Sequence, residues 1–494
     1  MPHKGIDHYL EAARRSASWH ENHLAEMKKC RFDTIAVHGI YSMQEAIDFN
    51  QGSIIEPIYM STSQAYRDSD EMEAALSYQI PTWCYSRIAN PSMYYLEGVL
   101  ALLEGYGAGD VETSCIATAS GMAAIQTAVD PFLLPDQENP TEQINFVAAA
   151  QVYGGTFQQF AVRKEKERGI TWRKVVNPGN IDEWEKLIDK NTRFVYGELP
   201  SNPGQSFFDL KKVIDLAHQH SIPVIIDSTV ATPALLRPLA LGADIVVQSV
   251  SKTLNTSGFG IAGAVISRKN LISKVGSPEM KANFALYAKT LPNRDNGPNI
   301  SPLNAALALN DIRTLRSRVD IQSRSTMTVA RYLADHKHVE QVDYLGLKSH
   351  PLHRLASEYL WLVDSEHDEQ YGEPLNRFGH LMSFRIKGGA ENTRNVFDSF
   401  TRIFRATDLG RIKSVATIPA ISTHSQQGEE GRQLADIPPN LIRLCVGAEH
   451  PEDIINDLDQ ALSSLDGKKI SFSAPEFSAG GASSAVLRRK GEEI

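Results

Sequence analysis

The strongest constraint on the fold of this 494-residue chain is an alternation of two patterns between about Tyr85 and Arg268. Short runs rich in β-branched residues alternate with longer stretches that have the period of an amphipathic helix. This alternation is typical of βαβ units, which form a mainly parallel sheet covered by helices. The segments predicted as strands are residues 113–117, 145–149, 193–198, 224–227 and 244–248.

Each of these predicted strands ends in small or polar residues. In an open α/β sheet, ligands bind outside the carboxyl ends of the strands, where the loops that follow them meet. The chemistry of this chain is therefore expected in the loops after the five strands.

Two of these strand ends carry the residue types that pyridoxal 5′-phosphate (PLP) requires. Asp227 ends one strand, and Lys252 follows the next one about 25 residues later, just after Ser249 and Ser251. PLP needs an amine for a Schiff base, an anion that keeps its pyridine nitrogen protonated and donors for its phosphate. Each residue alone also fits a plain role, because strand-end aspartates usually cap turns and most single lysines are surface lysines.

The loops after the other strands supply further matching residues. Ser120, Gly121 and Met122 open a helix, where glycine permits close approach and free N–H groups favour a phosphate dianion. Tyr153 is suited to stack on a pyridine ring, and Asn202 lies in a proline-bracketed loop that could aim its amide at a ring hydroxyl. An ordinary turn, a core tyrosine and an ordinary loop would explain these features singly, whereas together they favour a PLP site.

A set of motifs spread over most of the chain carries a resemblance to a known family. The motifs are Tyr85-Ser86-Arg87-Ile88-Ala89-Asn90-Pro91, Ser120-Gly121-Met122, Tyr153-Gly154-Gly155-Thr156, Pro200-Ser201-Asn202-Pro203, Asp227-Ser228-Thr229, Ser249-Val250-Ser251-Lys252 and Leu441-Ile442-Arg443-Leu444-Cys445-Val446-Gly447. Over about residues 32–465 the chain resembles the Cys/Met-metabolism family of PLP enzymes, which includes cystathionine γ-synthases and lyases, methionine γ-lyases and O-acetylhomoserine sulfhydrylases. The resemblance implies the aspartate aminotransferase-like α/β fold (fold type I), with a mainly parallel sheet in a large domain and a smaller α+β C-terminal domain.

The resemblance also implies a role for each motif. Lys252 would be the Schiff-base lysine and proton shuttle, Asp227 the partner of the pyridinium nitrogen, and Tyr153 the stacking ring. The phenolic oxygen would be contacted by Asn202. The phosphate would be held by Gly121, Met122, Ser249 and Ser251, with Ser120 and Thr229 as further cofactor contacts.

The remaining implied roles concern the substrate and a second subunit. Arg443, together with Ser414, would bind the α-carboxylate of an amino acid, for which a bidentate guanidinium is suited. Tyr85 and Arg87 would reach the phosphate of a neighbouring subunit, which implies a homodimer or homotetramer with shared active sites. Either Tyr85 or Tyr153 would assist protonation of the leaving group.

The expected reaction is γ-replacement on O-acetyl-L-homoserine, or a related O-acylated homoserine, by sulfide, a thiol or a carbon nucleophile. Residues 32–39, 422–426 and 442–450 look most like O-acetylhomoserine sulfhydrylases, which implies a place in methionine biosynthesis. Gly155 stands where methionine γ-lyases typically have a cysteine. The alternative is γ- or β-elimination on a sulfur amino acid such as cystathionine or methionine. A non-catalytic PLP-fold regulator is disfavoured because Lys252 and Asp227 are both kept.

One segment departs from the family pattern. After its lysine the family usually has an aromatic residue and a Gly-Gly-His or Ser-Gly-His segment, whereas this chain has Thr253-Leu254-Asn255-Thr256-Ser257-Gly258. The departure predicts a different pocket wall and leaves the identity of the nucleophile open.

Composition excludes several other classes. The 42% hydrophobic and 22% charged fractions are typical of soluble globular proteins, and no apolar run reaches the about 20 residues of a membrane-spanning helix. The formal net charge of -9 gives no broad positive field for nucleic acid, and residues 163–168 mix both signs as a solvent-exposed helix face would. The four cysteines are far apart and predict neither a metal site nor a disulfide framework, and the N-terminus lacks a secretory signal, so a cytoplasmic enzyme is expected.

The length of the chain predicts more than one packed unit. A helix is expected over residues 6–29, followed by an irregular stretch over 32–66, and these form an arm that lies on another surface. The expected units are an N-terminal arm (1–80), a PLP-binding large domain (81–325), a small domain (326–466) and a disordered tail (467–494). A long helical region at 301–336 leads from the large domain into the small one, which has strands at 382–386 and 441–446 and a surface insertion at 364–377.

Overall fold

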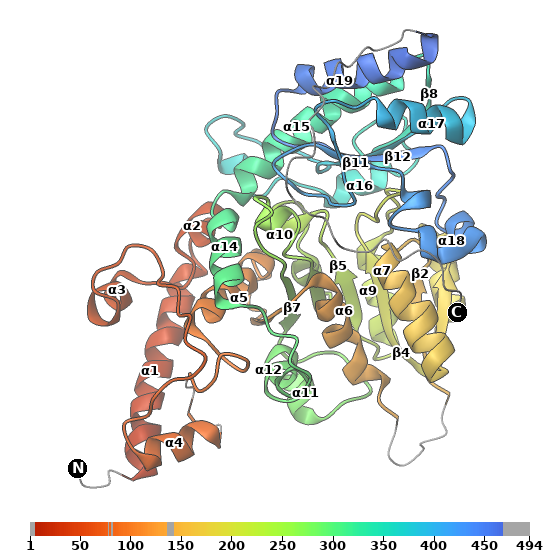
Figure 1. Ribbon diagram of the computed structural model, residues 1–494. Helices are drawn as coiled ribbons and strands as arrows, with labels where there is room; N and C mark the ends of the chain where they lie inside the picture. The colour runs from red at the N-terminus through yellow and green to blue at the C-terminus, as the bar shows by residue number, and fades with distance from the viewer. Residues whose placement is uncertain (1–4, 78, 81–82, 136–142, 468–494) are drawn as a thin grey trace, which may run out of the picture.

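The computed structural model describes residues 5–77, 79–80, 83–135 and 143–467. The tail expected at 467–494 therefore lies outside the described residues, apart from Gly467. The described residues form a larger and a smaller β-sheet, the helices that cover them, and an N-terminal arm (Figure 1).

The larger sheet has seven strands among the described residues, in the order β1-β7-β6-β5-β4-β2-β3. Neighbouring strands from β3 to β6 pair in parallel, and β7 pairs antiparallel with both β1 and β6, so only β7 is reversed. This confirms the predicted, mainly parallel α/β sheet. The strands are β1 (Thr113–Thr118), β2 (Asn145–Ala149), β3 (Thr171–Val175), β4 (Thr192–Glu198), β5 (Val224–Asp227), β6 (Ile245–Gln248) and β7 (Gly263–Arg268).

Both faces of this sheet are buried. Along β2, Phe146 and Ala148 belong to one hydrophobic cluster, while Val147 and Ala149 belong to another on the opposite face. Helices α5 (Pro91–Glu104) and α9 (Leu210–Gln219) contribute to the second cluster, and α6 (Gly121–Val129) and α12 (Phe284–Thr290) to the first. Burial on both faces explains why these strands are almost continuously apolar in sequence.

The smaller sheet has five strands among the described residues, in the order β10-β11-β12-β9-β8, and is mainly antiparallel. It lies at the top of the molecule in Figure 1, next to the long helix α15 (Leu315–Ala334) and α19 (Pro451–Ser463). Its strands are β8 (Val339–Asp343), β9 (Leu381–Ile386), β10 (Phe404–Arg405), β11 (Val415–Thr417) and β12 (Leu441–Cys445).

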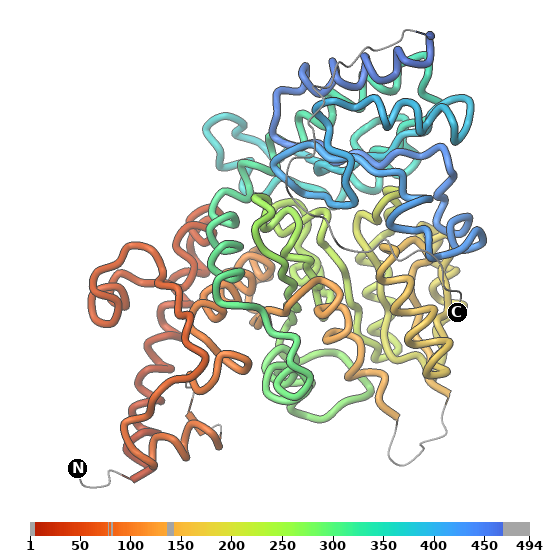
Figure 2. Tube along the Cα trace, viewed as in Figure 1, coloured from red at the N-terminus to blue at the C-terminus, as the bar shows by residue number. Residues whose placement is uncertain are grey.

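The N-terminal arm, drawn in red in Figure 2, projects from one side of the larger sheet. Its first helix, α1 (Ile6–Met27), was predicted, but the irregular stretch expected after it contains two short helices, α2 (Phe32–His38) and α3 (Met43–Phe49). Helix α2 buries Phe32, Ile35 and Ala36 on one face, a pattern too short to stand out in sequence. A further helix, α4 (Ser69–Leu76), packs on α1.

The remaining helices connect or cover these units. They are α7 (Gly154–Phe157), α8 (Ile181–Leu187), α10 (Thr232–Leu235), α11 (Pro278–Ala282), α13 (Pro292–Asn296), α14 (Pro302–Ile312), α16 (His353–Tyr359), α17 (Gly389–Asp398) and α18 (Gly428–Leu434). No helix among the described residues is both long and apolar enough to cross a membrane.

The charged run at 163–168 differs from the prediction in one respect. It lies at the end of helix η2 (Gln158–Lys166), and Lys164 is buried with only 3% of its side chain exposed, rather than pointing to solvent. Its ammonium forms an ion pair with Asp130, which compensates a charge that would otherwise be costly to bury.

The insertion expected at 364–377 is mostly exposed but firmly attached to the arm. Arg316 of α15, with 10% of its side chain exposed, donates to the Val363 carbonyl (2.7 Å) and pairs with Asp368 (2.7 Å) and with Asp33 of α2 (3.2 Å). The Asp364 carboxylate accepts from the Phe32 N–H at 2.9 Å. One arginine and one aspartate thus join segments about 300 residues apart in the chain.

Candidate active site

The loops after β1, β2, β4, β5 and β6 meet around a cavity of about 420 Å³, at the carboxyl ends of these parallel strands. The unit with the smaller sheet closes the cavity through Arg443 and, from an irregular segment between two of its strands, through Thr407, Asp408, Leu409 and Arg411. The residues singled out in sequence that line it are Ser120, Gly121, Met122, Tyr153, Asn202, Asp227, Thr229, Ser249, Ser251, Lys252 and Arg443.

Two carboxylates lie side by side in this cavity. Asp227 ends β5 and Glu198 ends β4, and the parallel pairing places these two residues opposite each other. Glu198 accepts a hydrogen bond from the Tyr153 N–H at 2.6 Å. Burial raises the pKa of both carboxyl groups, and the neighbouring Asp227 charge raises that of Glu198 further. A cation beside this pair, such as a protonated pyridine nitrogen, would relieve the repulsion between the two carboxylates. The pair therefore suits the pyridine nitrogen of PLP.

Lys252 stands on the turn that follows β6. Its N–H donates to the Ser249 carbonyl at 2.9 Å, and its ammonium Nζ lies 2.7 Å from Oδ1 of Asp408. With 28% of its side chain exposed, the amine can be reached from the cavity, as a cofactor-binding lysine requires.

The start of α6 forms a cradle suited to a phosphate. The Ser120 hydroxyl caps the helix by accepting from the Ala123 N–H, and the first N–H groups lie next to the cavity. A Cβ atom on Gly121 would lie 2.7 Å from the Ser249 side chain, so glycine allows the two loops to approach. The Ser251 hydroxyl, by contrast, is bonded to the Ala262 backbone at 2.9 Å.

Thr229 connects this cradle to the carboxylate pair. Its N–H donates to Asp227 at 3.0 Å, and its hydroxyl accepts from the Ser249 N–H at 2.8 Å. These bonds hold the loops after β5 and β6 in one arrangement.

Tyr153 presents a partly exposed ring to the cavity, and two glycines after it allow tight packing. A Cβ atom on Gly155 would lie 2.6 Å from the Tyr153 ring and 2.8 Å from the Met122 sulfur. A Cβ atom on Gly154 would lie 1.9 Å from the Thr423 carbonyl oxygen of the loop after β11. The two glycines after Tyr153 therefore allow the loop after β2 to pack between α6 and the smaller sheet.

Arg443 of β12 is a buried cation with 1% of its surface exposed. It donates to Asn202 at 3.2 Å and to the carbonyls of Thr407 and Asp408 at 3.1 and 2.7 Å, while its Nε has no hydrogen-bond partner among the described residues. Burial lowers the pKa of its guanidinium. A buried positive charge with an unused donor suits a carboxylate ligand.

Three predicted site residues do not line the cavity. Ser414 is buried nearby, but its hydroxyl donates to Glu449 at 2.9 Å and accepts from the Gly447 N–H at 2.9 Å. Tyr85 is 45% exposed, and the Arg87 guanidinium lies 5.6 Å from the centre of its ring. Arg87 also donates to the Arg294 carbonyl.

Three charged residues of the cavity were not predicted. Glu198 ends a predicted strand. It could have been found by the rule that singled out Asp227, which looks for polar residues at the carboxyl ends of strands. Asp408 and Arg411 lie in residues 406–414, which form neither helix nor strand, so no sequence period marks them. The departing segment 253–258 does not line the cavity but packs behind it, where the Thr256 hydroxyl donates to the Gly410 carbonyl at 3.0 Å.

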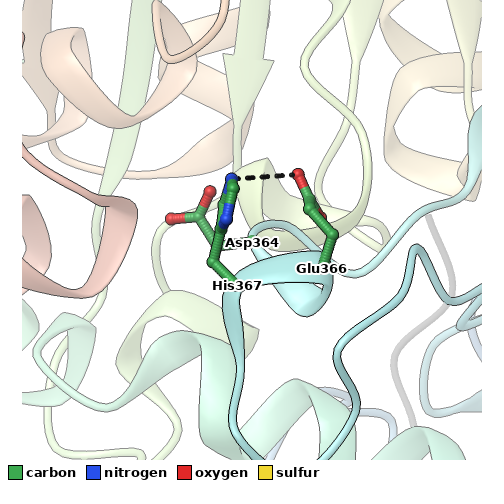
Figure 3. Close-up of side chains that lie close together, drawn as sticks. All are labelled: Asp364, Glu366 and His367. Atoms are coloured by element: carbon green, nitrogen blue, oxygen red, sulfur yellow. Dashed lines mark ion pairs between the residues drawn. The ribbon is translucent and has the colours of Figure 1, made fainter.

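A group of metal-ligand types lies outside the cavity. Asp364, Glu366 and His367 bring one ligand atom each within 4.8 Å of one another (Figure 3). Both oxygens of Asp364 already accept hydrogen bonds, from the Phe32 N–H and the Tyr106 hydroxyl, and the other two side chains are more than 40% exposed. Asp364 therefore has the structural role of attaching the arm.

Comparisons with known proteins agree with this geometry. A family model described as Cys/Met metabolism PLP-dependent enzyme matches residues 33–463. The chain is 32% identical to an L-methionine γ-lyase of Porphyromonas gingivalis over 442 residues (89% of this chain, 99% of the relative). It is 29% identical to an O-acetyl-L-homoserine sulfhydrylase of Corynebacterium glutamicum over 456 residues (88% of this chain, 97% of the relative).

A solved structure supports the same assignment. A protein of Campylobacter jejuni, assigned as an O-acetylhomoserine (thiol)-lyase and carrying an N′-pyridoxyl-lysine-5′-monophosphate, aligns with a TM-score of 0.76 and 32% identity. The alignment covers 88% of this chain and all of that one. With a family model that spans most of its length and a cavity whose residues fit the cofactor, the chain belongs to the Cys/Met-metabolism family of PLP-dependent enzymes.

Proposed function

We propose that this enzyme catalyses γ-replacement on O-acetyl-L-homoserine or a related O-acylated homoserine, with sulfide or a thiol as the incoming group. The observation that carries the proposal is the content of one cavity: a reachable amine (Lys252), a buried carboxylate pair (Glu198 and Asp227) and a buried guanidinium (Arg443). These groups match the aldehyde, the ring nitrogen and the carboxylate of an amino acid on PLP.

The residues divide the work according to their positions. Bound PLP supplies a protonated ring that draws electrons from the α-carbon of the substrate. Asp227 keeps a proton on the ring nitrogen, and Tyr153 covers the ring and excludes water. Lys252 holds the cofactor before the substrate arrives and afterwards moves a proton at the α-carbon. The Gly121 cradle and Ser249 hold the phosphate.

Arg443 and Asn202 orient the substrate. The free Nε of Arg443 supports binding of the α-carboxylate, while Asn202 Oδ1 already holds Nη1 of the same guanidinium. Fixing the carboxylate there directs the side chain of the substrate toward Tyr153, whose hydroxyl is our candidate for protonating the leaving group. Burial raises the pKa of Tyr153, which keeps it protonated for this step.

Replacement, rather than elimination, is supported by the crowding around Gly155. Gly155 stands where methionine γ-lyases typically have a cysteine. In this chain any side chain at that position would press on the Tyr153 ring and Met122. Elimination remains the second candidate because L-methionine γ-lyases are among the relatives at 32% identity.

The proposal includes a second copy of the chain. Tyr85 and Arg87 lie outside the cavity of their own subunit, and the arm exposes large apolar side chains that would suit a covered surface, with Phe49 78% and Ile54 90% exposed. We infer that Tyr85 and Arg87 complete the phosphate site of a neighbouring subunit. Arg87→Ala should weaken PLP affinity and dimerisation together, as measured by cofactor titration and sedimentation, and an unchanged affinity in a stable dimer would contradict the shared site.

Product identification tests the reaction itself. The purified enzyme is offered O-acetylhomoserine with and without sulfide, and the products are identified by mass spectrometry. We expect homocysteine only when sulfide is present, with little ketoacid. Ketoacid and ammonia released at the same rate in both cases would favour elimination.

A further inference from the structure

The ion pair between Lys252 and Asp408 is a feature that the proposed reaction does not use. The two side chains meet across the cavity, from the turn after β6 to the segment between β10 and β11. Their Nζ and Oδ1 atoms lie 2.7 Å apart, and 28% and 31% of the two side chains remain exposed. The amine that must bond to the cofactor is therefore already held by a carboxylate.

Asp408 is held firmly in place. Its second carboxylate oxygen accepts from Nε of Arg411, and Oδ1 also accepts from the Leu409 N–H at 2.9 Å. Its backbone carbonyl accepts from Arg443 at 2.7 Å. Arg411 and the Leu409 N–H thus hold the carboxylate next to Lys252, while Arg443 fixes the backbone of Asp408.

The segment that departs from the family pattern supports this arrangement. Arg411 donates through Nη1 to the Asn255 carbonyl at 2.8 Å, and the Ile412 N–H donates to the Thr256 carbonyl at 3.2 Å. Residues 253–256 are almost completely buried. The unusual sequence after the lysine and the aspartate opposite it therefore form one hydrogen-bonded unit: Asn255, Arg411, Asp408 and Lys252.

This unit competes with the cofactor for the lysine. A Schiff base forms only from a neutral amine, whereas an adjacent carboxylate stabilises an ammonium. Burial acts to raise the pKa of Asp408, but the charges of Lys252 and Arg411 outweigh it and lower that pKa overall, so Asp408 is ionised at neutral pH. Lys252 must leave Asp408 before it bonds to PLP.

We propose that Asp408, held by Arg411, is a positioning residue that binds the Lys252 amine whenever the lysine is not bonded to the cofactor. In the cofactor-free enzyme it restrains Lys252 at the mouth of the cavity and slows PLP uptake. Once a substrate amine has displaced the lysine, the same carboxylate receives it and keeps it close to the reacting carbon.

Cofactor uptake tests the proposal without any amino-acid substrate. The full-length enzyme is stripped of PLP and mixed with PLP at pH 7, and the absorbance of the bound chromophore is followed in stopped flow. Asp408→Asn should take up PLP about threefold faster, because partly exposed ion pairs of this kind contribute up to about 1 kcal/mol. Asp408→Glu, which keeps the charge, should stay closer to the wild-type rate.

Glu165→Gln is the matched control. Glu165 forms an ion pair with Lys174 away from the cavity, with 37% and 29% of the two side chains exposed, close to the values for Asp408 and Lys252. The Glu165→Gln variant should leave uptake unchanged. Equal or slower uptake by a folded Asp408→Asn enzyme would overturn the proposal.

A second readout uses the cofactor-free protein alone. Acylation of Lys252 by an activated ester, quantified by peptide mass spectrometry, reports how far the amine is released from Asp408 and accessible to the reagent. Asp408→Asn should raise the labelling of Lys252 severalfold relative to other lysines, and unchanged labelling would count against restraint by Asp408. Since neither assay contains a substrate, both results are independent of whether the reaction is replacement or elimination.

Discussion

The two walls of the cavity are held in place by different means. On the wall from the larger sheet, Asp227 ends a strand and Lys252 follows one closely, so backbone pairing sets their positions. On the wall from the smaller sheet, Asp408 and Arg411 lie in an irregular segment and are fixed by side-chain hydrogen bonds. Arg443 belongs to a strand, yet its guanidinium is also aimed by carbonyls of that segment.

This difference indicates a division between cofactor and substrate. The first wall carries the groups that fit PLP, whose shape is constant, and a sheet edge is a rigid place to put them. The second wall carries Arg443, which we propose binds the substrate, and an irregular segment in which a few substitutions can change charge and shape. We therefore expect changes on the first wall to affect cofactor binding and changes on the second wall to affect substrate use, except at Asp408, which contacts Lys252 of the first wall.

The largest effect is expected for Lys252→Ala on the first wall. The variant should lose the absorbance band of the lysine-bound cofactor, and turnover should fall by about 10⁴-fold because the covalent anchor and the proton carrier are removed together. Spectra and steady-state rates of the folded protein measure both. A variant that kept normal colour and turnover would contradict the assignment of Lys252.

Arg443→Gln on the second wall should spare the cofactor and impair the substrate. Removing one partner of a buried charge pair costs several kcal/mol, so kcat/KM should fall by about 10³-fold, mostly through KM, while the cofactor spectrum stays intact. The measurement follows the absorbance of the bound cofactor as amino-acid substrate is added, together with steady-state kinetics. If Arg443→Gln also lost the cofactor, the proposed division of roles between the two walls would be wrong.

Acid should destabilise the folded protein through two buried histidines that lie where the two walls of the cavity meet. His380 bonds to Thr253 beside Lys252, and His424 lies edge-on to Tyr153, with burial lowering the pKa of both imidazoles to about 4. The unfolded chain takes up these protons near pH 6.5 and the folded protein only near pH 4, so the free energy of unfolding falls as the pH drops through this window. The loss is up to roughly 3 kcal/mol for each histidine.

Urea unfolding at pH 7.5 and 4.5 measures this dependence. His380→Gln and His424→Gln should each reduce the difference between the two pH values, whereas His8→Gln, an exposed histidine of the arm, should leave it unchanged. An identical pH dependence in all four proteins would show that these two histidines do not contribute.

The smallest effect is expected for Gly155→Ala on the first wall. The added methyl group must displace the Tyr153 ring or Met122, an overpacking that typically costs 1–3 kcal/mol, so we expect kcat to fall about tenfold with little change in KM. Gly179→Ala is the control, because its Cβ would have no neighbour closer than 3.7 Å. Equal rates for the two variants would mean that the tyrosine is not tightly held.

Most of the first wall could be predicted from sequence, whereas on the second wall only Arg443 and its strand were predicted. Strands β2 and β5 have the predicted bounds because they are apolar runs bounded by polar turns, and their ends reveal the site. Strand β3 was not predicted, since Arg173 and Lys174 interrupt its apolar pattern at the edge of the sheet. Asp408 meets a lysine 156 residues away, and only packing of the two sheets brings them together.

The junction at Arg316 couples the arm to the insertion. Its guanidinium binds oxygens from both the arm and the insertion, and the Asp364 carboxylate of the insertion in turn holds the first N–H of α2. The final position of the arm therefore depends on contacts with the insertion as well as with α15. A chain cut within the insertion should release the arm as well, and with it the apolar surface that we propose pairs two subunits.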